Sequence, residues 1–278
     1  MADMITLTTD FGSAYAAAVK GSILRRTDAR LVDVSHDLAA HDVTAGAFWA
    51  RELLSGFPPA VHLVVVDPTV GSDRRAVVAS AGNHALVGPD NGVLAPAARA
   101  LAGDDSIEWY AAGDRPFDEK SFDARDVFGP LAAIVYEHWD EGGETMDRGA
   151  TMDDIGTMDE IDEVNGITTI DGLSAIDDPV DRSLPVADVD GDTASGLILA
   201  VDDFGNCITN VPASFLTGAS TIDVDGTEIP AERSFAAVDP GRPVAIAGSF
   251  GTVELAVNGG RASSWFALDP GDALTLRR

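Results

Sequence analysis

The sequence predicts an N-terminal α/β domain with a mainly parallel sheet over residues 1–140, and a small C-terminal β-barrel or sandwich over residues 188–278. In the first part, continuous runs of Val, Ile and Leu alternate with helix-length segments. Such runs are typical of strands buried on both faces of a parallel sheet. In the second part, short strands are separated by turns of Gly, Asp and Pro, as in small barrels and sandwiches. A chain of 278 residues is long enough for both domains.

The elements of the first domain follow in order along the chain. We expect strands over 5–9, within 31–37, and over 62–66, 76–80 and 85–87, and helices over 14–26, 43–54, 95–101 and 128–139. Gly88-Pro89-Asp90-Asn91-Gly92 is predicted to form a tight turn. Asp126 is expected as the N-cap of the last helix, with Pro130 in its first turn.

Residues 141–187 differ from their neighbours in composition. They are rich in acids, Gly and Thr and have little apolar periodicity, which predicts a linker or a surface excursion. Beyond them we expect strands over 196–201, 207–211, 221–224, 243–247, 252–257 and 273–276. Asp188–Asp192 begins like a calcium loop, but Thr193 and Leu199 stand where that loop needs Gly and Glu, so we reject it.

The chain is strongly acidic, with 46 Asp and Glu against 18 Lys and Arg and a net charge of −28. This charge disfavours nucleic acids and anionic membranes as partners. It indicates either a cation-binding protein or a halophilic surface adapted to high salt, and the spread of acids along the chain favours the second. Cys207 is the only cysteine, so an intrachain disulfide is excluded. Without a secretory signal or an apolar span, we expect a cytoplasmic protein.

Two aspartates follow apolar strands: Asp10 after 5–9 and Asp67 after 62–66. Parallel strands would bring both carboxylates to the sheet edge where α/β folds bind ligands. Asp10 has the two oxygens needed to accept both hydroxyls of a ribose, and it is equally consistent with a helix N-cap. Arg74 follows Asp67 by seven residues, and Gly71 permits the chain to turn back between them. The pair predicts a chemical site, with a structural ion pair as the alternative, and Arg75 can replace Arg74 in this argument.

Two further segments carry candidate site residues. In 121–130, Asp123 lies among charges flanked by phenylalanines, which predicts either a pocket wall or a solvated helix start. In 202–210, Phe204 offers a stacking face and Asn206 offers a donor and an acceptor, as a nucleobase requires. A hairpin turn is the alternative. The five histidines lack metal-ligand spacing, and Gly-rich nucleotide motifs are absent, so no metal or cofactor is expected.

Taken together, these segments resemble the S-adenosyl-L-methionine (SAM) hydrolases, also called SAM hydroxide adenosyltransferases, which are related to fluorinating and chlorinating enzymes. The matching segments occur in family order and span almost the whole chain: Thr8–Gly12, Lys20-Gly21, Val65–Pro68, Gly88–Gly92, Arg125–Phe128, Phe204–Asn206 with Thr209-Asn210, and Ser249–Gly251.

The resemblance implies an α/β domain, a small β-barrel and a homotrimer that binds SAM between neighbouring subunits. It implies that Asp10 holds the ribose, that Phe204 and Asn206 hold the adenine, and that Ser249 holds part of the methionine. Asp67 and Arg74 match two of the family's three hydrolytic residues. The third, a histidine before Gly-Arg-Asp, is replaced by Asp123 before Ala124-Arg125-Asp126. The loop after Gly12 is also about two residues shorter and lacks the family's second aspartate.

The function so implied is attack by water on C5′ of SAM, which yields adenosine and L-methionine with SAM as substrate and no cofactor. Asp67, Arg74 and Asp123 are the candidate catalytic residues. The alternatives are a halogenase that uses chloride as nucleophile, and an adenosine-binding protein without catalysis.

Overall fold

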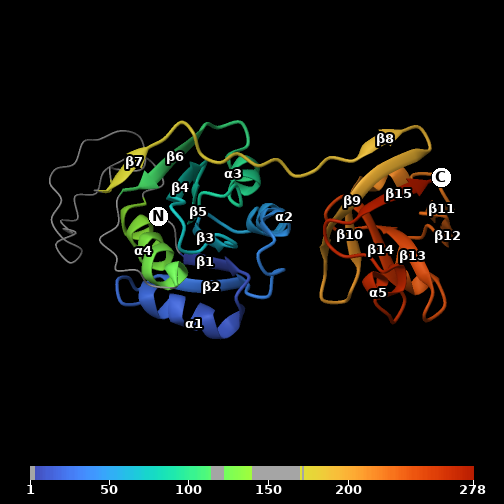
Figure 1. The fold of residues 1–278 in the computed structure, drawn as a ribbon, viewed down its shortest axis with the longest axis horizontal. Helices are drawn as coiled ribbons and strands as arrows, with labels where there is room; N and C mark the ends of the chain where they lie inside the picture. Colours follow the sequence, from blue (N-terminus) through green and yellow to red (C-terminus); the bar gives the residue numbers. More distant parts are fainter. Residues whose placement is uncertain (1–3, 114–121, 140–169, 171) are drawn as a thin grey trace. The chain divides into compact units, whose positions relative to one another are not determined.

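In the computed structural model, which describes residues 4–113, 122–139, 170 and 172–278, the chain divides into two units. The first comprises residues 1–183 and the second residues 184–278 (Figure 1). Residues 141–169 and 171 of the expected linker lie outside the described residues, and the domain boundaries proposed from the sequence stay a prediction.

The first unit contains a seven-stranded mixed sheet in the order β2-β1-β3-β5-β4-β6-β7. Its strands are β1 (Met4–Thr9), β2 (Arg30–Ser35), β3 (Val61–Val65), β4 (Ala76–Ala81), β5 (His84–Pro89), β6 (Ile107–Ala112) and β7 (Leu173–Ala175). The four strands β2, β1, β3 and β5 pair in parallel, and β4, β6 and β7 extend the sheet in antiparallel fashion. The α/β class is confirmed, with the parallel pairing confined to the part of the sheet that carries the predicted site. Strands β6 and β7 were not predicted.

Among the described residues, four α-helices accompany this sheet: α1 (Gly12–Ile23), α2 (Val43–Leu54), α3 (Ala95–Ala102) and α4 (Gly129–His138). Side chains of α1 and α4 share one apolar core with Ile5 and Leu7 of β1. Helices α2 and α3 contact one another on the other side (Figure 1). On α2, a Cβ at Gly46 would approach the Val66 side chain within 2.8 Å, so glycine is needed where this helix packs beside the end of β3.

The start of α4 differs from the sequence prediction. A π-helical turn over Ala124–Phe128 precedes the helix, and the Gly129 N–H donates to the Ala124 carbonyl five residues earlier. Pro130 follows in the first turn as predicted and has no N–H of its own, which favours such a widened turn. The prediction of Asp126 as N-cap is wrong, because Asp126 lies inside the π-turn and forms an ion pair with Arg125.

The second unit is an antiparallel sheet in the order β12-β11-β15-β9-β10-β14-β13, with β8 paired to β9. Its strands are β8 (Asp188–Asp190), β9 (Thr193–Val201), β10 (Cys207–Pro212), β11 (Thr221–Val224), β12 (Thr227–Pro230), β13 (Pro243–Ala247), β14 (Thr252–Val257) and β15 (Ala273–Arg277), and a short helix, α5, spans Ala262–Phe266. A bridge between Ala231 and Ala245 brings the two ends of the sheet together around one apolar core. The sheet is therefore a nearly closed barrel, as the family resemblance implied, and not a sandwich.

None of the helices that the structure describes has the length and apolarity required to cross a membrane.

A buried histidine near the start of β3 predicts how stability depends on pH. His62 Nδ1 lies 2.7 Å from Thr6 Oγ1, and His62 Nε2 lies 2.9 Å from His84 Nδ1. Burial, with a smaller contribution from His84, lowers the pKa of His62 to about 3. The unfolded chain gains a proton at this residue near pH 6.5, and the folded chain does not until about 3.

The free energy of unfolding is therefore expected to fall as the pH drops below about 6.5. The total fall corresponds to the pKa difference between the two states and is a few kcal/mol, on the order of 1.4 kcal/mol for each pH unit. Denaturant titrations across this range measure the slope. A His62→Gln variant is expected to flatten it, and an unchanged slope would contradict the assignment.

Candidate active site

Polar residues gather at one edge of the first sheet because four neighbouring strands are parallel. His36, Asp10, Asp67 and Asp90 follow β2, β1, β3 and β5 directly or within two residues, so all four emerge at the carboxyl ends of these strands. Strand β4 is antiparallel to β5, and the two arginines that precede it therefore start from the same edge. This edge brings together the side chains on which the predicted site depends.

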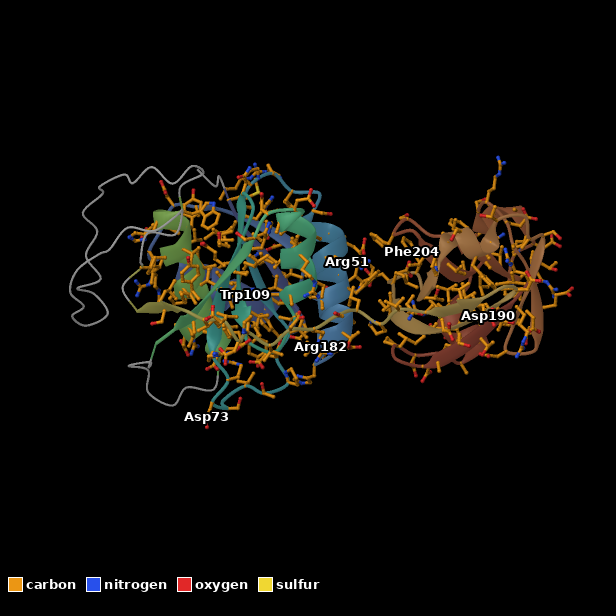
Figure 2. The ribbon with its side chains drawn as sticks, turned by 90° about the horizontal axis from the view of Figure 1, so that it is seen from above. Arg51, Asp73, Trp109, Arg182, Asp190 and Phe204 are labelled. Carbon is orange, nitrogen blue, oxygen red and sulfur yellow. The ribbon has the colours of Figure 1, made fainter. Side chains whose placement is uncertain are left out.

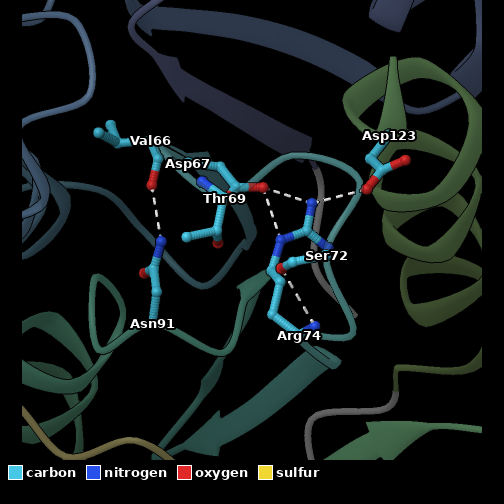
Figure 3. Close-up of polar contacts among 7 residues, drawn as sticks. All are labelled: Val66, Asp67, Thr69, Ser72, Arg74, Asn91 and Asp123. Atoms are coloured by element: carbon cyan, nitrogen blue, oxygen red, sulfur yellow. Dashed lines mark hydrogen bonds and ion pairs between the residues drawn. The ribbon is translucent and has the colours of Figure 1, made fainter. Parts of the chain in front are cut away.

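The loop after β3 folds Arg74 back onto Asp67 (Figure 3). Arg74 Nε donates to Asp67 Oδ2 at 2.6 Å, and Arg74 Nη2 contacts the same oxygen. The other oxygen, Oδ1, accepts hydrogen bonds from the Thr69 backbone N–H at 3.1 Å and from the Thr69 hydroxyl at 2.9 Å. Gly71 has a φ of 82°, which a residue with a side chain rarely adopts, and it permits the reversal. Both oxygens of Asp67 are thus held by its own loop.

Arg74 also reaches Asp123, the candidate that replaces the family histidine. Arg74 Nη2 donates to Asp123 Oδ2 at 2.7 Å (Figure 3). The guanidinium also lies 4.9 Å from the centre of the Phe128 ring. The side chains of Asp67, Arg74 and Asp123 are 2%, 6% and 12% exposed. Asp123 stands immediately before the π-turn, so the turn sets the direction of its carboxylate. The structure therefore brings the three candidate catalytic residues into one buried cluster with a formal charge of −1.

Arg75 does not take the place of Arg74. Its Nε donates to Asp90 Oδ2 at 2.7 Å, and its Nη1 donates to Asp178 Oδ1 at 2.8 Å. Hydrogen bonds to Asp178 and then to Asp90 raise the pKa of Arg75. The two neighbouring arginines diverge because successive side chains of an extended segment point in opposite directions. Arg75 instead links Asp178, which follows β7, to Asp90 at the end of β5.

Asn91 supports Asp67, a role that sequence reasoning missed. Its Nδ2 donates to the Val66 carbonyl at 2.9 Å, one residue before Asp67, and its Oδ1 accepts the Val93 N–H at 3.1 Å (Figure 3). The amide thereby joins the end of β3 to the turn after β5. The sequence signal was present in the turn Gly88–Gly92, where Asn91 was interpreted only as a turn former.

Asp10 is not a helix N-cap. Phe11 occupies the N-cap position of α1 and makes no side-chain capping bond, while Asp10 Oδ2 accepts the His41 N–H at 2.7 Å. The rings of Phe11 and Phe122 lie 5.4 Å apart. These aromatic residues are the chain neighbours of Asp10 and Asp123, so the two candidate residues are linked by a packed wall.

In the second unit, Phe204 and Asn206 belong to the turn between β9 and β10. Asp202 holds this turn by accepting the Asn206 N–H at 2.8 Å and the Asn206 side-chain Nδ2 at 3.0 Å. Phe204 is 79% exposed, and Figure 2 labels its side chain on the second unit. A Cβ at Gly205 would clash with Arg261, which packs across the turn. The hairpin alternative is thus correct as local structure, and the same turn presents an open aromatic face.

Ser249 is exposed in the turn between β13 and β14. Because Cys207 pairs with Leu255 and Pro212 with Thr252, Ser249 lies at the opposite end of β10 and β14 from the Phe204 turn. The barrel therefore does not bring Ser249 directly beside Phe204 and Asn206.

Comparison with known proteins matches both units. A family model described as the SAM hydroxide adenosyltransferase N-terminal domain matches residues 5–143, and one described as the C-terminal domain matches residues 196–275. Proteins named (R)-S-adenosyl-L-methionine hydrolase are similar to the chain. The one from Salinispora arenicola is 35% identical, over 98% of this chain and 97% of that protein. The one from Thermus thermophilus is 32% identical, over 96% of this chain and 97% of that protein.

Solved structures show the same fold. An uncharacterized conserved protein from Thermotoga maritima has a TM-score of 0.72 at 27% identity, covering 98% of this chain and 100% of that chain. A conserved hypothetical protein from Thermus thermophilus has a TM-score of 0.68 at 30% identity, covering 100% of this chain and 99% of that chain.

Proposed function

This chain belongs to the SAM hydroxide adenosyltransferase family, and we propose on that basis that it hydrolyses SAM to adenosine and L-methionine. The observation that carries the proposal is the position of Arg74, whose guanidinium bridges Asp67 and Asp123 at the carboxyl edge of the sheet. The names of the relatives further indicate the (R) diastereomer at sulfur as the preferred substrate.

The reaction requires little from the protein beyond aiming a nucleophile. A lone pair of the water oxygen forms a bond to C5′ while the C5′–sulfur bond breaks and its electron pair returns to sulfur. Methionine leaves as a neutral thioether and needs no acid. The proton released by the attacking water passes through the Asp67 carboxylate to solvent. Positioning and exclusion of bulk water supply most of the acceleration in such a step.

Each member of the cluster has a role in this proposal. Asp67 accepts a hydrogen bond from the water and orients it. Arg74 stabilises the negative charge that develops on the water oxygen. Asp123 holds the guanidinium from the other side, so that Arg74 keeps its direction while Asp67 engages the water. A carboxylate can do this where the family has a histidine, because both groups can accept a hydrogen bond from Arg74 Nη2.

The remaining candidates bind the rest of the substrate. Asp10 accepts the ribose hydroxyls, Phe204 stacks on the adenine and Asn206 bonds to its edge, and Ser249 contacts the methionine. Within the barrel, Ser249 is separated from the turn that contains Phe204 and Asn206. This separation suits an extended ligand, because adenine and methionine lie at opposite ends of SAM. We further infer a homotrimer in which such a site is shared between subunits, and a cytoplasmic enzyme whose acidic surface is adapted to salt.

The carboxylate of Asp67 favours water over chloride. It accepts a hydrogen bond from water, whereas its negative charge repels an anionic nucleophile. The chloride-dependent alternative therefore requires an anion to approach a carboxylate.

Incubation of the protein with each diastereomer of SAM, in potassium chloride and in potassium glutamate of equal molarity, tests the proposal. We expect adenosine and methionine in both salts, with faster turnover of the (R) form and with activity retained in molar salt. Formation of 5′-chloro-5′-deoxyadenosine in chloride would establish the halogenase alternative. Tight adenosine binding with no product in either salt would establish the binding protein.

A further inference from the structure

Four polar residues form a chain of contacts behind the Asp10 turn. Thr9 Oγ1 lies 2.8 Å from His36 Nδ1, and His36 Nε2 lies 3.0 Å from Asp33 Oδ1. The other oxygen of Asp33 accepts from Lys20 Nζ at 2.6 Å. Thr9 is fully buried and His36 is 8% exposed, whereas Asp33 and Lys20 reach the surface. These four side chains connect β1, β2 and α1, the three elements that surround Asp10.

A β-bulge brings His36 into this chain. Leu7 pairs with Asp33 and Thr8 with Ser35, so β2 has one extra residue at this point. In a regular strand Asp33 and Ser35 would face the same side of the sheet, and His36 the other. The extra residue turns His36 to the side of Asp33, which is the side that α1 covers. A bulge that re-aims a side chain beside a ligand-binding edge is a common functional feature of sheets.

The backbone around His36 is fastened to both sides of Asp10. The His36 carbonyl accepts the N–H of Gly12 at 2.8 Å, which satisfies one free donor in the first turn of α1. The N–H of His41, at the other end of the same loop, donates to Asp10 Oδ2 at 2.7 Å. Asp10 is thus oriented by the loop that begins at His36. His36 in turn is held by Thr9, the residue that precedes Asp10.

The charged groups in this series of contacts stabilise the arrangement. Burial opposes ionisation of Asp33, but the Lys20 ammonium and the His36 ring outweigh it and lower the pKa of Asp33. Asp33 lies at ion-pair distance from His36 Nε2, which has no partner with hydrogen-bond geometry among the described residues. The ring is therefore held by the Thr9 hydrogen bond on one side and lies against the Asp33 carboxylate on the other.

We propose that His36 is a positioning residue, which acts with Thr9 and Asp33 to hold the Asp10 carboxylate in the orientation that recognises a ribose diol. The inference rests on the proposed function, because it assumes that Asp10 binds the substrate ribose. It assigns to the Thr9–His36–Asp33 contacts a role in ligand selectivity that a purely structural hydrogen bond would not have.

The same strand contains a matched control. Thr6 makes an equivalent buried bond to a histidine, with Oγ1 2.7 Å from His62 Nδ1, three residues before Thr9. His62 lies on β3, near the amino ends of the strands, and this bond does not contact the Asp10 loop. Thr6→Val and Thr9→Val therefore each remove one buried Thr–His hydrogen bond, and only the second lies beside Asp10.

Binding of adenosine and of 2′,3′-dideoxyadenosine, measured by calorimetry on the full chain, tests the inference. The wild type is expected to prefer adenosine, and Asp10→Ala to lose that preference. Thr9→Val is expected to reduce the preference by about tenfold, the equivalent of one misdirected hydrogen bond. Thr9→Ser, which keeps the hydroxyl, and Thr6→Val are expected to retain it. The melting temperatures of Thr6→Val and Thr9→Val are expected to fall by similar amounts.

Retention of the preference in Thr9→Val, together with its loss in Asp10→Ala, would overturn the role of His36 and leave the proposed function intact. Retention in Asp10→Ala would overturn the ribose assignment itself, and the inference with it. If Thr9→Val does not fold, Asp33→Asn replaces it, because this side chain is 48% exposed and its change opens no cavity. It removes the charge that orients His36, and an undiminished preference in that variant would likewise overturn the inference.

Discussion

An Arg74→Met variant is expected to lose almost all SAM hydrolysis and also to unfold much more easily than the wild type. The substitution leaves Asp67 and Asp123 facing one another, with side chains 2% and 12% exposed and without the guanidinium between them. Breaking a buried ion pair by removing one partner costs about 3–5 kcal/mol. Loss of one group that stabilises charge in a transition state costs about a hundred- to a thousandfold in rate. Denaturant unfolding and the rate of adenosine release measure the two effects.

Arg75→Met is the matched control for Arg74→Met. It removes the neighbouring arginine, which also pairs with an aspartate at the end of a strand but whose side chain is 33% exposed. Its partners, Asp90 and Asp178, lie outside the proposed catalytic cluster. We expect a smaller loss of stability and less than a tenfold loss of rate. Equal losses of rate in the two variants would contradict the assignment of Arg74.

A triple variant separates the two effects of Arg74. Adding Asp67→Asn and Asp123→Asn to Arg74→Met removes the two carboxylate charges that Arg74 bridged, and much of the lost stability is expected to return. Activity is not expected to return, because the groups that orient the water are then all absent. Recovery of hydrolysis in this variant would show that Arg74 acts only as a structural counter-ion.

An Asp67→Asn variant is expected to lose about a hundred- to ten-thousandfold in kcat/KM for SAM, the range for removal of a general base. Asparagine has nearly the same shape, and its side-chain oxygen can still accept from Thr69 or Arg74. The variant therefore lacks the negative charge and one acceptor while the loop is retained. Chromatography of adenosine formed from SAM measures the rate, and the unfolding free energy shows whether the fold is preserved.

Asp90→Asn is the matched control for Asp67→Asn. Asp90 follows the strand next to that of Asp67, is similarly buried at 8% exposure and pairs with Arg75. Its loss is expected to weaken the attachment of residues 178–180, because Asp90 Oδ1 also accepts the Val180 N–H at 2.7 Å. A small effect on rate is expected. Full SAM hydrolysis in Asp67→Asn would show that Asp67 does not assist the water.

The elements that could be predicted from the sequence are those whose signals are local. Helix α2 was predicted at its observed bounds, Val43–Leu54, and the structure adds Asp42 as its N-cap. Strand β6 and the edge strand β7 were missed, because both are only partly buried and lack a continuous apolar run. The π-turn was also missed. The turn depends on Pro130 and on the close packing of Gly129 before it. A widened turn of this kind has no characteristic spacing of apolar residues, so the sequence pattern does not indicate it.

By itself, the sequence determined the α/β class of the first part and the short strands of the second, the strands that precede Asp10 and Asp67, and enough ordered motifs to identify the family. These properties depend on residues close together in the chain. The tertiary structure decided that Arg74 and not Arg75 meets Asp67, that Asp123 completes the cluster, and that a bulge turns His36 toward Thr9. Such choices depend on the direction of each side chain within the sheet, since a shift of one residue in register sends a side chain to the opposite face.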